Sequence, residues 1–245
     1  MPQKLKTNRP RLIFHGNAVP FGGRIVNMSG KPFLASIPGP PSSSLAVVGG
    51  WSRAPSTGSS YRDIFKWGAT LADSKGEMRA DGHFITTVTS SIADVHAKHA
   101  PFSFDAGRLS ITIVSDHFKP DEEPGIAPTE IVFEGLQLDG QPIELDRDTA
   151  LIDYPTFTSY CLKHVVGPRT SGGYVATSFV RSIRWKKRKI QGNALSLKGF
   201  GTIYFGEVLM NEYNRRVTMV RLAMGSAIEA EAACAEADPN GTWGN

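Results

Sequence analysis

A chain of 245 residues, 40% hydrophobic and 20% charged, has the composition of an ordinary globular protein, which excludes collagen-like and intrinsically disordered classes. The net charge of +4 is spread over the whole length, so overall charge indicates no particular partner. The 25 glycines and 16 prolines require many turns, and this favours a sheet-rich fold over a helical one.

One β-domain is predicted over residues 11–225, after a basic tail at residues 1–10. Only residues 12–14 are apolar before a polar residue follows, whereas a signal peptide needs a run of about 7 to 15. No stretch approaches the roughly 18 uninterrupted apolar residues of a membrane helix. We expect neither a leader nor a membrane span, and the compartment stays open between the cytoplasm and the cell exterior.

Residues 38–60 are rich in proline, serine and glycine. This composition predicts a long surface loop within the domain, holding one short strand at residues 45–48.

Strand patterns dominate the rest of the domain. Residues 109–114 are rich in β-branched side chains and predict a buried strand. Residues 130–145 contain two apolar runs on either side of Asp139-Gly140, a pair that favours a tight hairpin turn. Residues 201–224 predict a second hairpin, because their apolar side chains recur with a period of two.

The C-terminal segment, residues 226–245, is expected to form a helix or a tail. Ser226 lies three residues before Glu229, as in a capping box, and Pro239 would end a helix rich in alanine and glutamate. Residues 229–232 also alternate glutamate and alanine, so an edge strand is the alternative.

Asp94, His96 and His99 are the candidate metal ligands. On a helix the two imidazoles would share a face, a spacing that suits zinc. On a strand Asp94 and His96 would share a face and His99 would point away, so solvated loop histidines are the favoured interpretation.

Residues 181–189 contain the densest positive charge, with Trp185 in the middle. Read as one strand, Arg184, Lys186 and Arg188 would face opposite to Trp185, Lys187 and Lys189. Such a patch could protect a sheet edge, contact an acidic partner or bind nucleic acid, in decreasing order of preference. The basic patch comprises Arg181, Arg184, Lys186, Lys187, Arg188 and Lys189.

Carboxylates and cysteines give weaker signals. Asp121-Glu122-Glu123 lacks the ligand spacing of a calcium loop. Asp146 and Asp148 would share a strand face and could perform acid/base chemistry. On a strand Cys161 and His164 would lie on opposite faces, which argues against a nucleophile and its base. Cys161 and Cys234 could form one disulfide. No motif for a cofactor is present, and no cofactor is expected.

Residues 16–23 (GNAVPFGG), residues 133–143 (FEGLQLDGQPI) and the strand at residues 217–225 together resemble bacterial choice-of-anchor P-type domains. Those domains are β-rich and generally exported. The resemblance implies a surface or extracellular domain with a structural or adhesive role, and it transfers no catalytic residues. We expect neither the family's leader nor its C-terminal sorting tail, a departure from the pattern that bears on export and anchoring.

We therefore predict an all-β fold, a two-layer antiparallel sandwich or jelly-roll-like domain. Its core is expected from the regions around Leu109, Val132, Ile203, Leu209 and Val220. The first functional hypothesis is a non-enzymatic structural or interaction module, whose partner is another protein or a second copy.

Two further hypotheses differ in class from the first. One is a carbohydrate-binding sandwich, with stacking platforms from Trp51, Tyr61, Trp67 or Trp185. The other is an enzyme with a dispersed site, whose candidate residues are Asp94, His96, Asp146 and Asp148; an enzyme is disfavoured because no catalytic motif is present.

Overall fold

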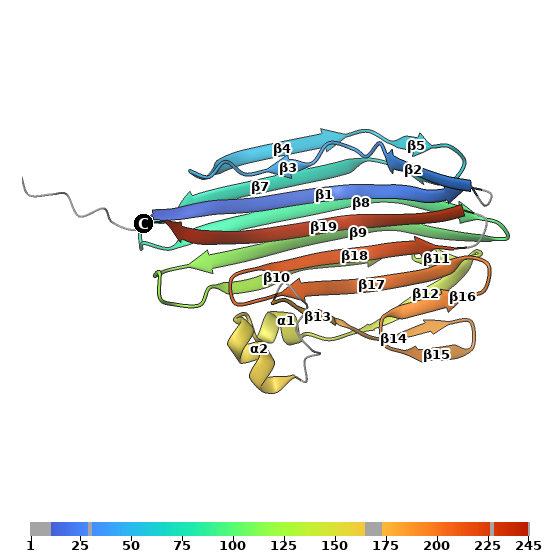
Figure 1. Cartoon of the computed structure of the whole chain (residues 1–245). Helices are drawn as coiled ribbons and strands as arrows, with labels where there is room; N and C mark the ends of the chain where they lie inside the picture. Colours follow the sequence, from blue (N-terminus) through green and yellow to red (C-terminus); the bar gives the residue numbers. More distant parts are fainter. Residues whose placement is uncertain (1–10, 29–30, 165–172, 226–227, 245) are drawn as a thin grey trace, which may run out of the picture.

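The computed structural model describes residues 11–28, 31–164, 173–225 and 228–244, which form two stacked antiparallel sheets (Figure 1). Strand makes up 69% of the structure and helix 5%, which confirms the predicted all-β, sandwich-like fold. The basic tail expected at residues 1–10 lies outside the described residues.

The larger sheet contains eleven strands, with the sixteen-residue strands β8 and β9 near its centre. Its order is β15-β14-β12-β11-β9-β8-β6-β5, β10 pairs with β9, and β7 lies between β8 and β4. The bounds are β4 (Gly50–Ser56), β5 (Ser59–Tyr61), β6 (Phe65–Trp67), β7 (Thr70–Met78), β8 (Phe84–His99), β9 (Phe102–His117), β10 (Gly125–Glu134), β11 (Gln137–Leu138), β12 (Gln141–Arg147), β14 (Val180–Trp185) and β15 (Arg188–Gln191).

The smaller sheet contains eight strands in the order β13-β17-β18-β19-β1-β2, with β16 on β17 and β3 on β1. The bounds are β1 (Arg11–Met28), β2 (Lys31–Ile37), β3 (Ser43–Ser44), β13 (Val175–Ser178), β16 (Ala194–Leu197), β17 (Gly201–Met210), β18 (Arg215–Met224) and β19 (Ile228–Gly244).

The core fills the space between the sheets. Leu109, Ile203 and Val220 are fully buried there, as predicted. Val132 and Leu209, expected beside them, are partly exposed. Leu209 faces outward because its neighbours Val208 and Met210 point into the core, and side chains alternate along a strand.

Both predicted hairpins form. Asp139 (φ 52°) and Gly140 (φ 67°) make the two-residue turn between β11 and β12, where Leu138 pairs with Gln141. Positive φ at both turn positions matches the right-handed twist of the flanking strands. The predicted buried strand at residues 109–114 lies within β9, and the second hairpin is β17–β18.

The C-terminal segment is a strand, so the expected helix or tail is wrong. β19 pairs with both β1 and β18 and lies inside the smaller sheet rather than at its edge. The predicted alternation holds: Ala230 and Ala232 are buried while Glu231 faces outward. Pairing on both sides outweighs the helix propensity of alanine. Ser226, the expected cap, lies outside the described residues.

Residues 38–60 contain more strand than expected. They form β3, β4 and the start of β5. The strand predicted at residues 45–48 does not form. Pro55 is tolerated in β4 because β4 pairs only with β7, leaving its other edge open.

Two short helices, α1 (Ala150–Asp153) and α2 (Phe157–Lys163), follow β12. Thr156 caps α2 by accepting a hydrogen bond from the Ser159 amide. No helix within the described ranges is long and apolar enough to span a membrane.

Candidate functional site

The basic run forms a hairpin rather than one strand. Trp185 pairs with Arg188, so Lys186 and Lys187 make the turn between β14 and β15, at the edge of the larger sheet (Figure 1). Lys186 adopts a φ of 55°, which two-residue hairpin turns require.

The turn changes which basic side chains share a face. Arg184 and Lys189, expected on opposite faces, lie directly opposite each other across the hairpin and therefore on the same face. The strand alternation predicted for residues 181–189 is thus wrong beyond Trp185, because a chain reversal breaks the period of two.

Trp185 anchors this hairpin to the sandwich. Only 8% of it is exposed, and its indole Nε1 donates to the main-chain carbonyl of Leu138 at 3.4 Å. The ammonium of Lys186 lies 4.3 Å from the indole centroid, a cation–π geometry. The tryptophan fixes the hairpin in place and offers no open face for stacking.

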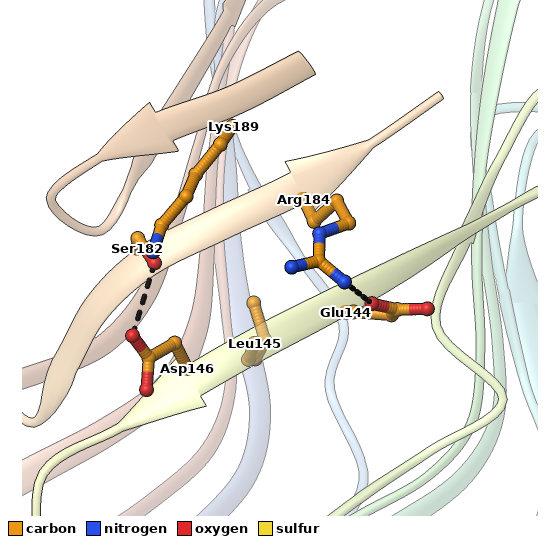
Figure 2. Close-up of a pocket in the computed structure, with 6 residues that line it drawn as sticks. All are labelled: Glu144, Leu145, Asp146, Ser182, Arg184 and Lys189. Carbon is orange, nitrogen blue, oxygen red and sulfur yellow. Dashed lines mark hydrogen bonds and ion pairs between the residues drawn. The ribbon is translucent and has the colours of Figure 1, made fainter. Parts of the chain in front are cut away.

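A shallow polar depression of about 270 Å³ lies on the outer face of β12, β14 and β15 (Figure 2). Arg184 donates to Glu144 at 3.0 Å, and the Ser182 hydroxyl donates to Asp146 at 3.2 Å. Lys189 reaches across the same depression from β15 (Figure 2). Its lining residues are Glu144, Leu145, Asp146, Ser182, Arg184 and Lys189.

Asp148 has a structural contact of its own beside the depression. The backbone shifts register between Asp146 and Arg147, and Asp148 lies beyond β12, so the two carboxylates do not share a strand face as predicted. Asp148 accepts from Arg181 at 2.8 Å and from the amide of Ala150. Burial works to raise the pKa of Asp148, but these hydrogen bonds outweigh it and the pKa lies below its usual value.

The tip of the hairpin carries uncompensated positive charge. Arg181 and Arg184 are paired with Asp148 and Glu144. The remaining four cations are exposed, and within the described residues none of them has an ion pair. These four residues are Lys186, Lys187, Arg188 and Lys189, called the cationic tip below.

The metal candidates diverge along β8. Asp94 is exposed, and His96 lies on the outer face with its Nδ1 2.6 Å from Asp105. His99 points inward and donates from Nε2 to the Gly225 carbonyl at 2.7 Å. Within the described part of the chain, no group of three His, Cys, Asp or Glu is arranged to hold a metal ion.

The aromatic candidates are not gathered. Trp51 is 66% exposed on β4, where its indole donates to Asp73 at 2.8 Å. Trp67 is 3% exposed and stacks on Phe21 at 4.6 Å, while Tyr61 packs against the core. Trp67 and Trp185 are therefore core residues and offer no open face for stacking, whereas Trp51 remains exposed.

The remaining candidates have local structural partners. Glu122 pairs with Lys119, and Glu123 accepts from the Thr158 amide at the start of α2. Cys161 and Cys234 are not joined by a disulfide.

Cys161 and His164 belong to α2 and its C-cap, so the assumption of a strand there is wrong. Three residues apart on a helix they are neighbours, but the His164 ring stacks on Tyr160 at 4.8 Å.

The dispersed enzyme site is likewise not assembled. Asp94 and His96 lie on β8 and Asp146 lies on β12, with β9 and β11 between these strands.

The structure thus defines an all-β sandwich with a cationic hairpin at one sheet edge. Residues 12–164 match the family model for a domain of unknown function, DUF8256, and because the match covers more than half of the chain, the chain belongs to that family. No curated protein and no solved structure matches it. The matched region includes the centre of the larger sheet and ends before the cationic hairpin.

Proposed function

We propose that the protein is a non-enzymatic interaction module that docks an acidic protein surface through the cationic tip. The observation that carries the proposal is the set of four exposed cations on one hairpin, none of which forms an ion pair within the described part of the chain. Charges that are not neutralised within the chain attract and orient an oppositely charged partner.

The anchoring of the hairpin supports a docking role. Trp185 fixes β14 through its burial and its hydrogen bond to Leu138. The ion pairs of Arg181 and Arg184 tie the same strand to its neighbours. A preorganised loop loses less conformational entropy when it binds, so more of the electrostatic attraction contributes to the binding free energy.

An alternative role for the same charges is edge protection. β15 is an edge strand, and lysines on an edge oppose pairing with other chains. The two roles predict different results when the charge is removed. If the charges protect the edge, the protein would self-associate; if they dock a partner, partner binding would be lost.

The test uses labelled poly-L-glutamate as an acidic polypeptide, with binding followed by fluorescence anisotropy. A Lys187→Glu, Arg188→Glu, Lys189→Glu variant reverses the tip. The control variant makes the same charge change at three exposed sites elsewhere: Arg79→Glu, Lys98→Glu and Lys198→Glu. We expect the tip variant to bind at least about tenfold more weakly than the control, with a difference that shrinks as salt rises.

Equal binding by the two variants would contradict the proposal, and so would absence of binding by the wild type. Self-association of the tip variant with unchanged poly-L-glutamate binding would assign edge protection instead. Tighter binding of single-stranded DNA than of poly-L-glutamate, lost in the tip variant, would assign the tip to nucleic acid.

The location of the protein at the cell surface is also a proposal. The resemblance to choice-of-anchor P-type domains supports a structural or adhesive role outside the cell, and an interaction surface suits such a role. Immunogold labelling of intact bacterial cells that express the full-length protein would show a surface signal, and labelling only after permeabilisation would contradict it.

A further inference from the structure

A line of backbone irregularities, called the crease, crosses the outer face of the larger sheet, while β8 and β9 run through it without a break. Gly68 separates β6 from β7, Asp94 is a kink within β8, and Gly135 separates β10 from β11. The β8–β9 pairing skips from Ala93–Arg108 to Val95–Ala106, so Asp94 and Gly107 occupy the unpaired position between them, and Gly107 lies against Gly135. The crease is the line Gly68, Asp94, Gly107 and Gly135, so three of its four positions carry no side chain.

Asp94 supplies the only side chain of the crease. Its φ is 48°, a left-handed conformation that glycine adopts more easily. A Cβ added at Gly68 would lie 2.7 Å from the Asp94 carboxylate, so the carboxylate covers the space that Gly68 leaves open. A charged group thus stands where backbone conformation alone would favour glycine.

A pocket of about 650 Å³ opens at this end of the crease. Lys66 and Asp94 both line it, together with the hydroxyl residues Ser59 and Ser60. Within the described residues neither the Lys66 ammonium nor the Asp94 carboxylate has an ion pair or side-chain hydrogen bond. The pocket therefore presents a free donor and a free acceptor of opposite charge.

Beside the crease, polar side chains continue across five strands. Strand register pairs Ser60 with Lys66, Lys66 with His96, His96 with Asp105, and Asp105 with Gln137. Paired residues share a face, and neighbouring strands lie about 4.8 Å apart. This polar row extends over roughly four strand spacings. His96 and Asp105 bind each other within it at 2.6 Å, and Ser60, Lys66 and Gln137 supply the remaining donors and acceptors.

The chemistry of the crease and the row selects one class of ligand. Neither the crease nor the polar row contains an aromatic or large aliphatic side chain. Trp67 also lines the pocket but is only 3% exposed, so an apolar ligand is disfavoured. Both charge signs are present, which disfavours a polyanion. Glycines allow close approach to the backbone, and a row of mixed donors and acceptors matches a chain rich in hydroxyl groups.

We propose that the crease and the polar row form a binding site for a neutral oligosaccharide, separate from the cationic tip. The carboxylate of Asp94 accepts from ligand hydroxyls, and Lys66 donates to ligand oxygens. The polar row holds the neighbouring sugar units.

The test is isothermal titration of the full chain with neutral hexasaccharides, namely maltohexaose, cellohexaose, mannohexaose and chitohexaose, and with the anionic hexagalacturonate. Asp94→Gly removes the carboxylate and suits the backbone at φ 48°. Asp121→Gly removes one exposed carboxylate from a loop outside the crease. We expect one neutral hexasaccharide to bind, Asp94→Gly to weaken it at least about tenfold, and Asp121→Gly to leave it unchanged.

Thermal unfolding separates a binding role from a structural one. We expect the Tm of Asp94→Gly to equal or exceed that of the wild type, because the strained conformation is relieved. A lower Tm with unchanged affinity would make Asp94 structural and overturn the proposal. Failure of all four neutral hexasaccharides to bind would also overturn it, as would tighter binding of hexagalacturonate that Asp94→Gly does not reduce.

The tip variant distinguishes this inference from the proposed function. Lys187→Glu, Arg188→Glu, Lys189→Glu is expected to bind the hexasaccharide like the wild type. Loss of sugar binding in that variant would place the sugar on the hairpin and contradict a site in the crease.

Discussion

The guanidinium of Arg215 donates to the main-chain carbonyl of Leu151 at 3.1 Å and thereby joins β18 to α1. Arg215 is 2% exposed and also donates to the Tyr154 carbonyl at 3.4 Å. Burial lowers its pKa to about 10. The last carbonyls of α1 and the nearby ring of Tyr160 compensate its charge in part.

Arg215→Met should destabilise the protein. The thioether fills part of the space, but two buried carbonyls lose their donors, and we expect the free energy of unfolding to fall by about 2–4 kcal/mol. Urea denaturation would measure the change. Arg216→Met, at the adjacent and partly exposed position, is the control and should change stability by less than about 0.5 kcal/mol. Equal losses in both variants would refute the role of Arg215.

His117 should make stability fall in mild acid. The side chain is 2% exposed, and burial lowers its pKa from 6.5 to about 4, with Asp116 partly opposing the shift. The unfolded chain then binds a proton between these values while the folded chain does not, so stability drops as pH falls from 6.5 towards 4. Between pH 7.5 and 5 we expect a loss of about 2 kcal/mol from this residue.

The measurement compares wild type with His117→Gln by urea denaturation at both pH values. Other groups, including Asp238 with its raised pKa, contribute equally to both proteins and cancel in the difference. The variant should lose about 2 kcal/mol less than wild type on acidification. An identical pH dependence in the two proteins would show that His117 does not titrate in this way.

Arg221 and Glu207 should be strongly coupled on the outer face of the smaller sheet. The guanidinium donates to the two Glu207 oxygens at 2.6 and 2.8 Å, and it lies 4.0 Å from the Tyr204 centroid. The hydrogen bonds to Glu207 outweigh desolvation and raise the pKa of Arg221. A double-mutant cycle of Arg221→Ala and Glu207→Ala should give a coupling energy of about 1–2 kcal/mol.

A cycle of Arg24→Ala and Glu231→Ala provides the comparison. That pair meets through one contact of 3.1 Å, and the Arg24 side chain is 60% exposed. Its coupling should stay below about 0.5 kcal/mol. Equal coupling energies in the two cycles would show that the two hydrogen bonds from Arg221 to Glu207 do not strengthen this pair.

Gly140→Ala should isolate the effect of backbone conformation. No atom lies within 4 Å of an added Cβ, so the only penalty comes from the φ of 67°. We expect a loss of about 1 kcal/mol in the free energy of unfolding. Gly225→Ala has equally open space without a positive φ and should not destabilise the protein. Equal losses of unfolding free energy in the two variants would show that the positive φ of Gly140 is not the cause.

Periodic sequence signals predicted much of the fold. Asp139-Gly140 identified its turn because its chemistry is specific to positive φ. The Lys186-Lys187 turn was missed because lysine carries no such signal. The period of two also fails locally: Met219 and Val220 are adjacent and both fully buried, beside Gly206 and Ala235 with positive φ. The register is the same on both sides of this irregularity, so no residue is inserted, and a single sequence gives no reliable signal of it.

The crease shows a second limit. Gly68, Gly107 and Gly135 are far apart in the chain, and only the register of four strands aligns them with Asp94. Glycines inside strand-like segments were the available signal, since such positions often mark bulges or close approach. The sequence indicates Asp94 as a metal ligand because His96 and His99 follow it closely. In space Asp94 lies beside Gly68 and Lys66, and this arrangement supports the proposed binding site instead.

Arg11 pairs with Gly244, and β1 remains paired with β19 as far as Met28 and Ile228. The middle of the smaller sheet therefore joins the first and last strands of the described chain. Closing so long a loop is slow, and topologies rich in such pairings fold late. During synthesis on the ribosome, β1 cannot pair with β19 until β19 has emerged, so the smaller sheet is not completed before that point.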